Sequence, residues 1–274
     1  MDSRMPGKIF ANTLLGLGAI IILTPFIWML SLSVKPENEI YTPHISLLPK
    51  EWDFANYLEA LTYGETGTFV INGLIVTLSI LALQLLTIIP AAYVLARKDF
   101  KLNKLCFALV LAALLIPPHV PAIPLYLAMG SLKLLNTYTV LIVPFVTSAF
   151  GIFLLRQSFK SLPQDLLDAA KIDGAGEAYT LWTILVPQIM PAIAAFSVFS
   201  IISHWNDFFW PLLVVSDMSM ATPPLGVSIF ASDEGGHDVG PMMASATMIV
   251  LPLVIVFLIA RKYFVQGTTM TGIK

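Results

Sequence analysis

The stretch DAAKIDGAGEAYTLWTILVP, residues 168–187, is a polar segment between two long apolar runs. It combines small residues, an Asp-Gly break at Asp173-Gly174 and a closing proline at Pro187. The whole chain is 57% hydrophobic and 12% charged, whereas soluble domains carry about 25% charged residues. A polar helix-turn-helix in so apolar a chain must therefore face water, lipid headgroups or another protein.

The apolar runs on both sides are long enough to cross a membrane, which takes about 20 residues each. Six such runs occur, so we expect an all-α membrane protein with six transmembrane helices in a single domain, residues 1–274. The first run is longer than a signal-peptide h-region and is interpreted as an anchor. The expected spans are Ile9–Val34, Phe69–Ala96, Leu105–Gly130, Leu134–Leu155, Thr183–Trp205 and Met242–Ala260.

The basic residues indicate how these spans are oriented, because lysine and arginine favour the cytoplasmic side. With the N-terminus inside, only Lys35, Lys50 and Lys133 of the 15 basic residues fall outside. This orientation puts both termini and the polar segment in the cytoplasm. The outer loops are then residues 35–68 and 216–241, and glycines at 235, 236 and 240 are expected to make the second loop mobile.

The third expected span contains four prolines, Pro117, Pro118, Pro121 and Pro124. Membrane helices tolerate proline where neighbouring groups or water satisfy the freed carbonyls. We therefore expect a broken or strongly kinked helix that lines a packed, partly wet interior, with a simple kink as the alternative.

Within the polar segment, one helix should end at Asp173-Gly174, because glycine tolerates the left-handed conformation. A second helix should resume near Gly176. Leu166, Leu167, Ala170 and Ile172 have the spacing of an apolar stripe. The small residues let another protein approach closely, while an amphipathic helix resting on headgroups is the alternative. Composition alone leaves both open.

Asp168-Ala169-Ala170, then Asp173-Gly174-Ala175, then Ile184–Pro187 resemble the EAA loop of ABC importer permeases. Asp168 stands where that pattern has glutamate, which keeps the charge and shortens its reach. Further segments are similar to the maltose-type carbohydrate importers, and among them to the MalG-like subunit. These are Asn72, Ala91–Arg97, Ile123–Tyr126, Leu135–Thr137 and Trp205–Asp207.

This resemblance implies a type I ABC importer permease fold with a cytoplasmic coupling helix in the loop of about residues 161–187. It implies a carbohydrate pathway shared with a second, MalF-like permease in the bacterial cytoplasmic membrane. Two ATP-binding subunits and an extracytoplasmic substrate-binding protein are the other implied partners, besides membrane lipid. The residues implied to couple to the ATP-binding subunits are Leu167, Asp168, Ala169, Ala170, Asp173, Gly174 and Ala175.

No segment fits the P-loop pattern G-x-x-x-x-G-K-[ST] that holds ATP. We therefore expect ATP and magnesium to be bound by partner subunits, with no cofactor on this chain and no enzymatic activity of its own. The four histidines lack metal-ligand spacing, and Cys106 is the only cysteine. The net charge of −2 gives no indication of nucleic-acid binding.

A polar group inside a membrane usually faces protein or water. His119 is therefore a candidate for the substrate pathway, with a structural hydrogen bond as the alternative. The cluster His204-Trp205-Asn206-Asp207 is the other candidate, because aromatic faces and hydrogen-bonding side chains suit a sugar. In the alternative interpretation Trp205 and Trp210 anchor the interface and Asp207 caps the span.

Other classes stay open. The chain could be a stand-alone secondary transporter or channel, although such proteins usually bury ionisable residues for ion coupling. It could also be an ABC permease for a solute other than a sugar. An intramembrane enzyme would need a clustered catalytic set that the sequence does not offer.

Overall fold

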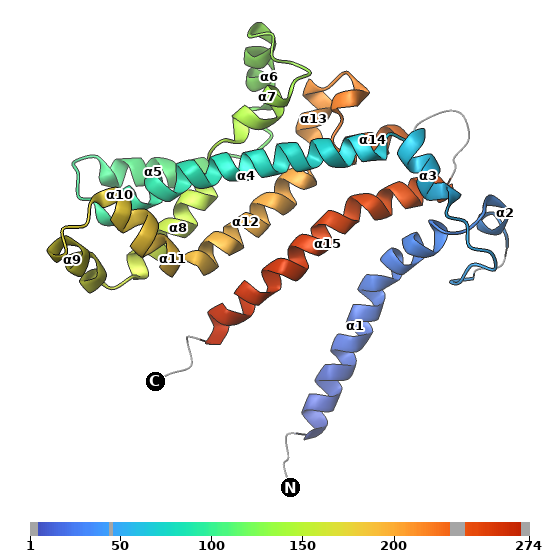
Figure 1. Ribbon diagram of the computed structural model, residues 1–274, viewed down its shortest axis with the longest axis horizontal. Coiled ribbons are helices and arrows are strands. Elements are labelled where there is room, and N and C mark those ends of the chain that lie inside the picture. Colours follow the sequence, from blue (N-terminus) through green and yellow to red (C-terminus); the bar gives the residue numbers. More distant parts are fainter. Residues whose placement is uncertain (1–4, 44–45, 231–238, 270–274) are drawn as a thin grey trace. The chain divides into compact units, whose positions relative to one another are not determined.

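The computed structural model describes residues 5–43, 46–230 and 239–269. The described residues form helices joined by turns, with no strand among them (Figure 1). The chain divides into two compact units, which are described separately. One unit comprises Met1–Gly67 and Gly226–Pro252, and the other comprises Thr68–Leu225 and Leu253–Lys274.

Among the described residues, three helices are long and apolar enough to cross a membrane without a break: α1 (Met5–Leu32), α4 (Thr66–Arg97) and α15 (Val239–Thr269). They correspond to the first, second and sixth expected spans. Two bent helix pairs are long and apolar enough only when each pair is counted as one span. The pair Tyr138–Phe145 and Ala149–Ser161 turns by 41°, and the pair Glu177–Gln188 and Met190–Trp205 turns by 79°.

The third expected span is broken into two short apolar helices, α5 (Asn103–Leu114) and α6 (Ala122–Ser131). Pro117, Pro118 and Pro121 lie in the connection between them. Because proline lacks an N–H and clashes with the preceding turn, the helix cannot continue through this segment. The prediction of a broken third helix is confirmed.

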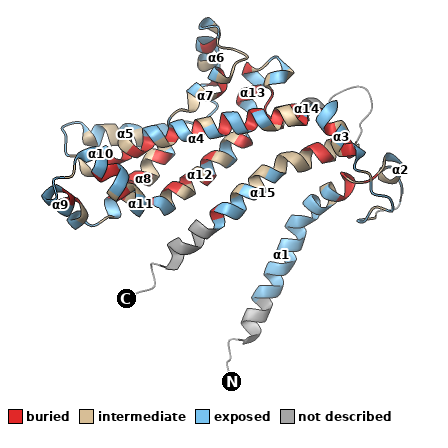
Figure 2. Ribbon diagram, in the orientation of Figure 1, coloured by how far each residue is buried: buried red, intermediate tan, exposed pale blue. Residues whose placement is uncertain are grey.

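In the first unit, α1 is exposed along most of the side chains that the structure describes (Figure 2). The segment that follows α1 is ordered by α2 (Glu37–Ile40), α3 (Ala55–Thr62) and buried polar contacts. Asn56 on α3 donates from Nδ2 to the carbonyl oxygens of Ser33 at 3.2 Å and of Lys35 at 2.9 Å. The expected outer loop at residues 35–68 is therefore tied to the end of α1.

The expected outer loop at residues 216–241 contains the short helix η3 (Met218–Met220) and α14 (Pro223–Phe230). Residues 231–238, with Gly235 and Gly236, lie outside the described part. Gly240 belongs to α15, and a Cβ atom there would lie 2.6 Å from Oδ1 of Asn56. The expectation that Gly240 gives a loop mobility is wrong, because this glycine permits close packing of a helix.

The main core of the second unit lies between α4, α8 (Ala149–Ser161) and α12 (Met190–Trp205). Its central side chains include Ile88, Leu155, Phe159, Leu185 and Phe196. A second cluster gathers around α7 (Tyr138–Ile142) and α13 (Phe209–Val214). These clusters hold the bent spans against the long α4.

Two asparagines fix the connections of this unit. Buried Asn72 on α4 donates from Nδ2 to the carbonyl oxygens of Ser219 and Ala221, both at 2.9 Å, and its Oδ1 accepts from Tyr138 Oη at 2.6 Å. Asn136 has a φ of 59° and accepts at Oδ1 from the backbone N–H of Ser216 and of Asp217.

Candidate functional site

The polar segment forms two helical pieces separated by a turn. The first is α9 (Gln164–Ile172), and the second runs through α10 (Glu177–Tyr179), η2 (Thr180–Leu185) and α11 (Val186–Gln188). Leu167 on α9 is 7% exposed and belongs to the same core as Leu181 and Leu185. Hydrophobic burial of Leu167 therefore holds α9 to the bundle.

The turn after α9 has the geometry that the sequence predicts. Gly174 has a φ of 71°, which glycine adopts without a steric penalty, and no atom lies within 4 Å of the place where its Cβ would be. Gly176 then precedes α10 in an extended conformation. The helix stop at Asp173-Gly174 and the restart near Gly176 are confirmed.

The coupling residues implied by the resemblance divide into two groups. Leu167 and Ala170 are buried, so they form the face of α9 that packs against the rest of the unit. Asp168, Ala169, Asp173 and Gly174 are exposed, while Ala175 is half-buried. The predicted apolar stripe is only partly correct, because Ile172 is 86% exposed. The exposed residues of α9 and of the turn after it thus include small residues, the three carboxylates of Asp165, Asp168 and Asp173, and the side chains of Lys171 and Ile172.

Two consecutive basic residues fix both ends of this segment. Arg97, the last residue of α4, donates from Nε to the Phe159 carbonyl at 3.0 Å and from Nη1 to Oε1 of Gln164 at 3.2 Å. Lys98 forms an ion pair with Glu177 at the start of α10. Its hydrogen bond with Glu177 raises the pKa of Lys98, so the lysine stays charged. The end of α4 therefore holds the chain on both sides of α9.

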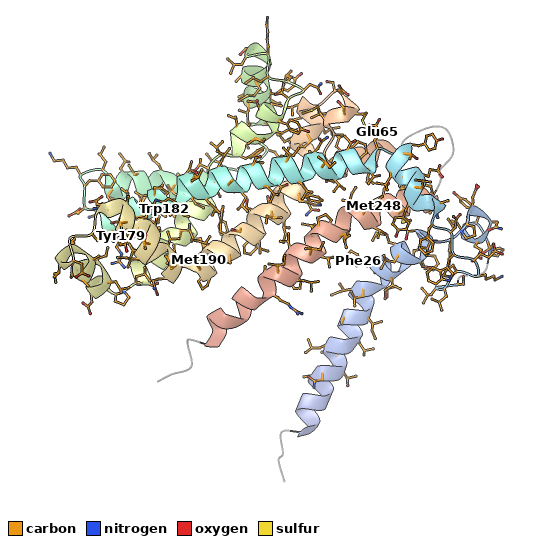
Figure 3. All side chains as sticks on the ribbon, in the orientation of Figure 1. Phe26, Glu65, Tyr179, Trp182, Met190 and Met248 are labelled. Carbon is orange, nitrogen blue, oxygen red and sulfur yellow. The ribbon has the colours of Figure 1, made fainter. Side chains whose placement is uncertain are left out.

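The segment after the turn presents aromatic side chains. Tyr179 is 59% exposed and Trp182 is 43% exposed, and Figure 3 shows both on the piece of chain that leads to Met190. Tyrosine and tryptophan are enriched at membrane–water interfaces. Two exposed aromatic side chains next to α9 therefore suit a position at such an interface.

A second candidate site is a buried polar network between α4 and α12. Ser200 donates from Oγ to Oε1 of Gln84 at 2.6 Å, and Nε2 of Gln84 lies 3.3 Å from Nε2 of His204. Gln84 is only 3% exposed. Because a buried polar group without a partner is costly, this network fixes the three side chains relative to one another.

The network borders two cavities that share lining residues. The larger has a volume of about 810 Å³ and the smaller about 330 Å³, and Phe145, Ser203 and His204 line both. Phe150, Phe196 and Phe199 add aromatic walls to the larger cavity. Such volumes fall within the range of about 300–1,000 Å³ that is typical of ligand sites. Aromatic walls with a few hydrogen-bonding groups can hold a polyhydroxylated molecule.

The predicted pathway residues divide between the cavities and the packed interior. His119, His204 and Asp207 all line the smaller cavity, and the His119 ring lies 4.5 Å from that of Phe209. Trp205 is only 2% exposed, and Asn206 is exposed and donates to the Ile202 carbonyl of its own helix at 2.8 Å. Neither lines a described cavity.

Asp207, which lines the smaller cavity, also stabilises the start of a helix. Its Oδ1 accepts from the backbone N–H of Trp210 at 3.2 Å, within the first turn of α13. A carboxylate at a helix N-terminus satisfies a free N–H and complements the helix dipole. Asp207 thus stabilises the start of the helix that follows it, from the position before the N-cap residue Phe208, rather than the end of the span that precedes it.

Sequence reasoning missed Gln84, Ser200 and Ser203. Gln84 is an amide in the middle of the second apolar run, and a polar side chain at that depth was a usable signal. The two serines gave no comparable signal, because small hydroxyl residues are common where membrane helices pack. Among the described residues, no three of His, Cys, Asp or Glu gather closely enough to hold a metal ion.

Comparison with known proteins gives the class of this fold and site. Residues 85–270 match the family of binding-protein-dependent transport system inner membrane components. The crystal structure of a bacterial ABC transporter involved in the import of the acidic polysaccharide alginate contains a similar chain. The TM-score is 0.86 at 25% identity, covering 96% of this chain and 98% of the other.

Permeases of named transport systems align with this chain over nearly its full length. The arabinooligosaccharides transport system permease AraQ of Halalkalibacterium halodurans is 33% identical over 260 residues, 93% of this chain and 92% of the relative. The diacetylchitobiose uptake permease NgcG of Streptomyces coelicolor is 33% identical, covering 96% and 87%. The sn-glycerol-3-phosphate permease UgpE of Yersinia pestis is 30% identical, covering 97% and 98%.

The chain therefore belongs to the binding-protein-dependent transport system inner membrane components and is a membrane-spanning permease of the ABC importer type.

Proposed function

We propose that this chain is one permease subunit of an ATP-driven importer for a carbohydrate, with a second homologous permease forming the other half of the pathway. Two ATP-binding subunits bind ATP with magnesium and hydrolyse it, and a substrate-binding protein delivers the solute from outside. The chain itself carries no ATPase activity. The relatives AraQ and NgcG, whose names refer to oligosaccharides, support a carbohydrate as the cargo.

The observation that carries this proposal is the form of α9. Its inner residues, Leu167 and Ala170, are buried in the bundle, whereas its exposed face carries small and acidic residues together with Lys171, which lies 4.0 Å from Asp168. A partner that docks on this face can move α9 as a unit, because Arg97 and Lys98 tie the flanking chain to α4. Closure of the ATP-binding subunits would thereby tilt the spans.

The proposed orientation follows from the basic residues. Both termini and α9 lie in the cytoplasm of a bacterial cell, and the segments at 35–68 and 216–241 lie outside. The coupling residues are Leu167, Asp168, Ala169, Ala170, Asp173, Gly174 and Ala175. The cavities beside Gln84 and His204 are proposed as the part of the pathway that this subunit contributes.

The docking step is tested with Gly174→Asp, which places a side chain at a φ of 71° on the outer face. Gly176→Asp is the matched control, because Gly176 has a φ of −65° and open space around it. We expect the first variant to insert normally and to lose co-purification with the ATP-binding subunits, and the control to keep it. Normal co-purification of Gly174→Asp would overturn the docking proposal.

The alternative of a stand-alone transporter is tested separately. The purified chain is reconstituted alone in vesicles with an ion gradient, and uptake of a labelled oligosaccharide is followed. Gradient-driven uptake without partner subunits would contradict the proposed function.

A further inference from the structure

A basic pocket lies at the end of α4, away from the cavities described above. It has a volume of about 610 Å³ and is bordered by the end of α4, the α4–α5 connection, the start of α5 and the last turns of α8. Four of its lining side chains are cationic, and Asp99 is the only anionic one. The cationic residues are Lys101, Lys104, Arg156 and Lys160.

Arg156 is the fixed centre of this pocket. The residue is 8% exposed, its Nε donates to the Leu95 carbonyl at 3.1 Å, and its guanidinium lies 3.5 Å from the ring centroid of Phe107. Among the described residues, neither terminal nitrogen of Arg156 has a protein acceptor, and no carboxylate forms an ion pair with it. Both terminal nitrogens are accessible from the pocket, so they are available to donate to an anion bound there.

The lysines around Arg156 are also without carboxylate partners in the described part of the chain. The two ion pairs found there join Lys98 to Glu177 and Lys171 to Asp168, and neither involves a pocket residue. One wall of the pocket is held by Asn103, which donates from Nδ2 to the Lys98 carbonyl at 2.7 Å across the α4–α5 connection. The pocket therefore combines one buried, fixed arginine with three exposed lysines around it.

An apolar track begins at the same place. Leu102, Leu105 and Leu109 follow one face of α5 with helical spacing and are 58%, 56% and 62% exposed. No side chain of α5 itself is buried in this chain. A positive pocket that adjoins bare leucines matches a molecule with an anionic head and an apolar tail.

We propose that this pocket binds the phosphate headgroup of an anionic phospholipid, with an acyl chain lying along α5. The inference rests on the proposed function for one point, that this end of α4 lies at the cytoplasmic leaflet, where anionic lipids are concentrated. Basic pockets between transmembrane helices on that side are known to suit such headgroups. The bound lipid would brace the residues next to Arg97 and Lys98, which hold α9.

The test is native mass spectrometry of the full chain purified in detergent, with and without its ATP-binding subunits. Phosphatidylglycerol and phosphatidylcholine with identical acyl chains are titrated separately. The variant Lys104→Gln/Lys160→Gln removes two exposed charges and leaves Arg156 and its packing intact. Lys50→Gln/Lys133→Gln removes the same charge at exposed positions outside the pocket and is the matched control.

We expect wild type and control to retain phosphatidylglycerol in preference to phosphatidylcholine. The pocket variant should bind phosphatidylglycerol roughly 25-fold more weakly, from about fivefold for each of the two lysines near the headgroup. Equal retention of the two lipids by wild type, or unchanged retention by the pocket variant, would overturn the proposal.

Two further measurements test whether the pocket binds something other than a lipid. If inorganic phosphate raises the melting temperature through the same lysines and phosphatidylglycerol does not, the site takes a free phosphate and the lipid proposal fails. If the pocket variant loses the ATP-binding subunits while keeping its lipid, the pocket is a protein contact and the proposal also fails. Lipid retention is measured on this chain alone, whereas docking is measured by co-purification of the Gly174→Asp variant. Failure of the lipid proposal and failure of the docking proposal are therefore distinguishable.

Discussion

Arg97 and Gln164 are hydrogen-bonded at 3.2 Å, which joins the last residue of α4 to the first residue of α9. The same guanidinium also holds the carbonyl oxygens of Phe159 and Leu162. One side chain thus connects the long span α4, the end of α8 and the entrance to α9. In the proposed function, this side chain is the point at which a force on α9 would act on both spans.

We predict that Arg97→Gln uncouples ATP hydrolysis from transport. Hydrogen bonds to charged groups contribute about 1.5–3 kcal/mol each, and glutamine cannot reproduce the fork of donors. Co-purification with the ATP-binding subunits should persist, because the outer face of α9 is unchanged. Uptake per ATP hydrolysed should fall about tenfold in proteoliposomes. Lys133→Gln, a charge loss outside the basic pocket, serves as control, and an equal fall in that variant would contradict the prediction.

The Lys98–Glu177 ion pair should persist over the physiological pH range. Glu177 raises the pKa of Lys98 above its ordinary value of 10.5, so the stabilisation is complete below that pH and is lost as the pH rises through the raised value. Both side chains are partly exposed, so the effect is small, at most about 1 kcal/mol. The melting temperatures of wild type and Lys98→Gln should differ by the same few degrees at pH 6 and pH 9. A difference that disappears by pH 9 would be inconsistent with this assignment.

Gly151→Ala should destabilise the second unit. A Cβ atom at Gly151 would lie 2.7 Å from both Cδ1 of Ile88 and Cε2 of Phe196, at the junction of α8 with α4 and α12. Overpacking of this kind costs about 1–3 kcal/mol. Thermal unfolding in detergent measures it, with Gly130→Ala as control, where the nearest atom is Leu135 Cδ1 at 3.6 Å. Equal melting temperatures for the two variants would refute the packing argument.

Gln84→Leu should reduce transport without preventing assembly. The substitution keeps the approximate size and removes the amide that binds Ser200 and His204. Uptake of the cognate sugar should fall at least tenfold, while the amount of assembled complex stays close to that of wild type. Asn206→Ala, which tests the predicted pathway residue that lines no described cavity, gives the comparison. A larger loss of uptake for Asn206→Ala than for Gln84→Leu would contradict the assignment of the pathway to these cavities.

The sequence by itself determined the features that depend on local physics. Runs of about 20 apolar residues marked the spans because lipid requires them. The prolines of the third span predicted its break, and Asp173-Gly174 predicted the turn at which α9 ends. These signals lie within a few residues of the structure that they produce, so no knowledge of packing was needed to interpret them.

Only the tertiary structure decided which residues act together. Gln84 meets His204 across 120 positions of sequence, and Arg97 meets Gln164 across 67. The tertiary structure also buries Trp205, which the sequence offered as a pathway residue, and leaves Ile172 exposed, although its spacing predicted a place in an apolar stripe. Side-chain contacts between distant helices depend on how the bent spans pack, and hydrophobic periodicity carries no information about that packing.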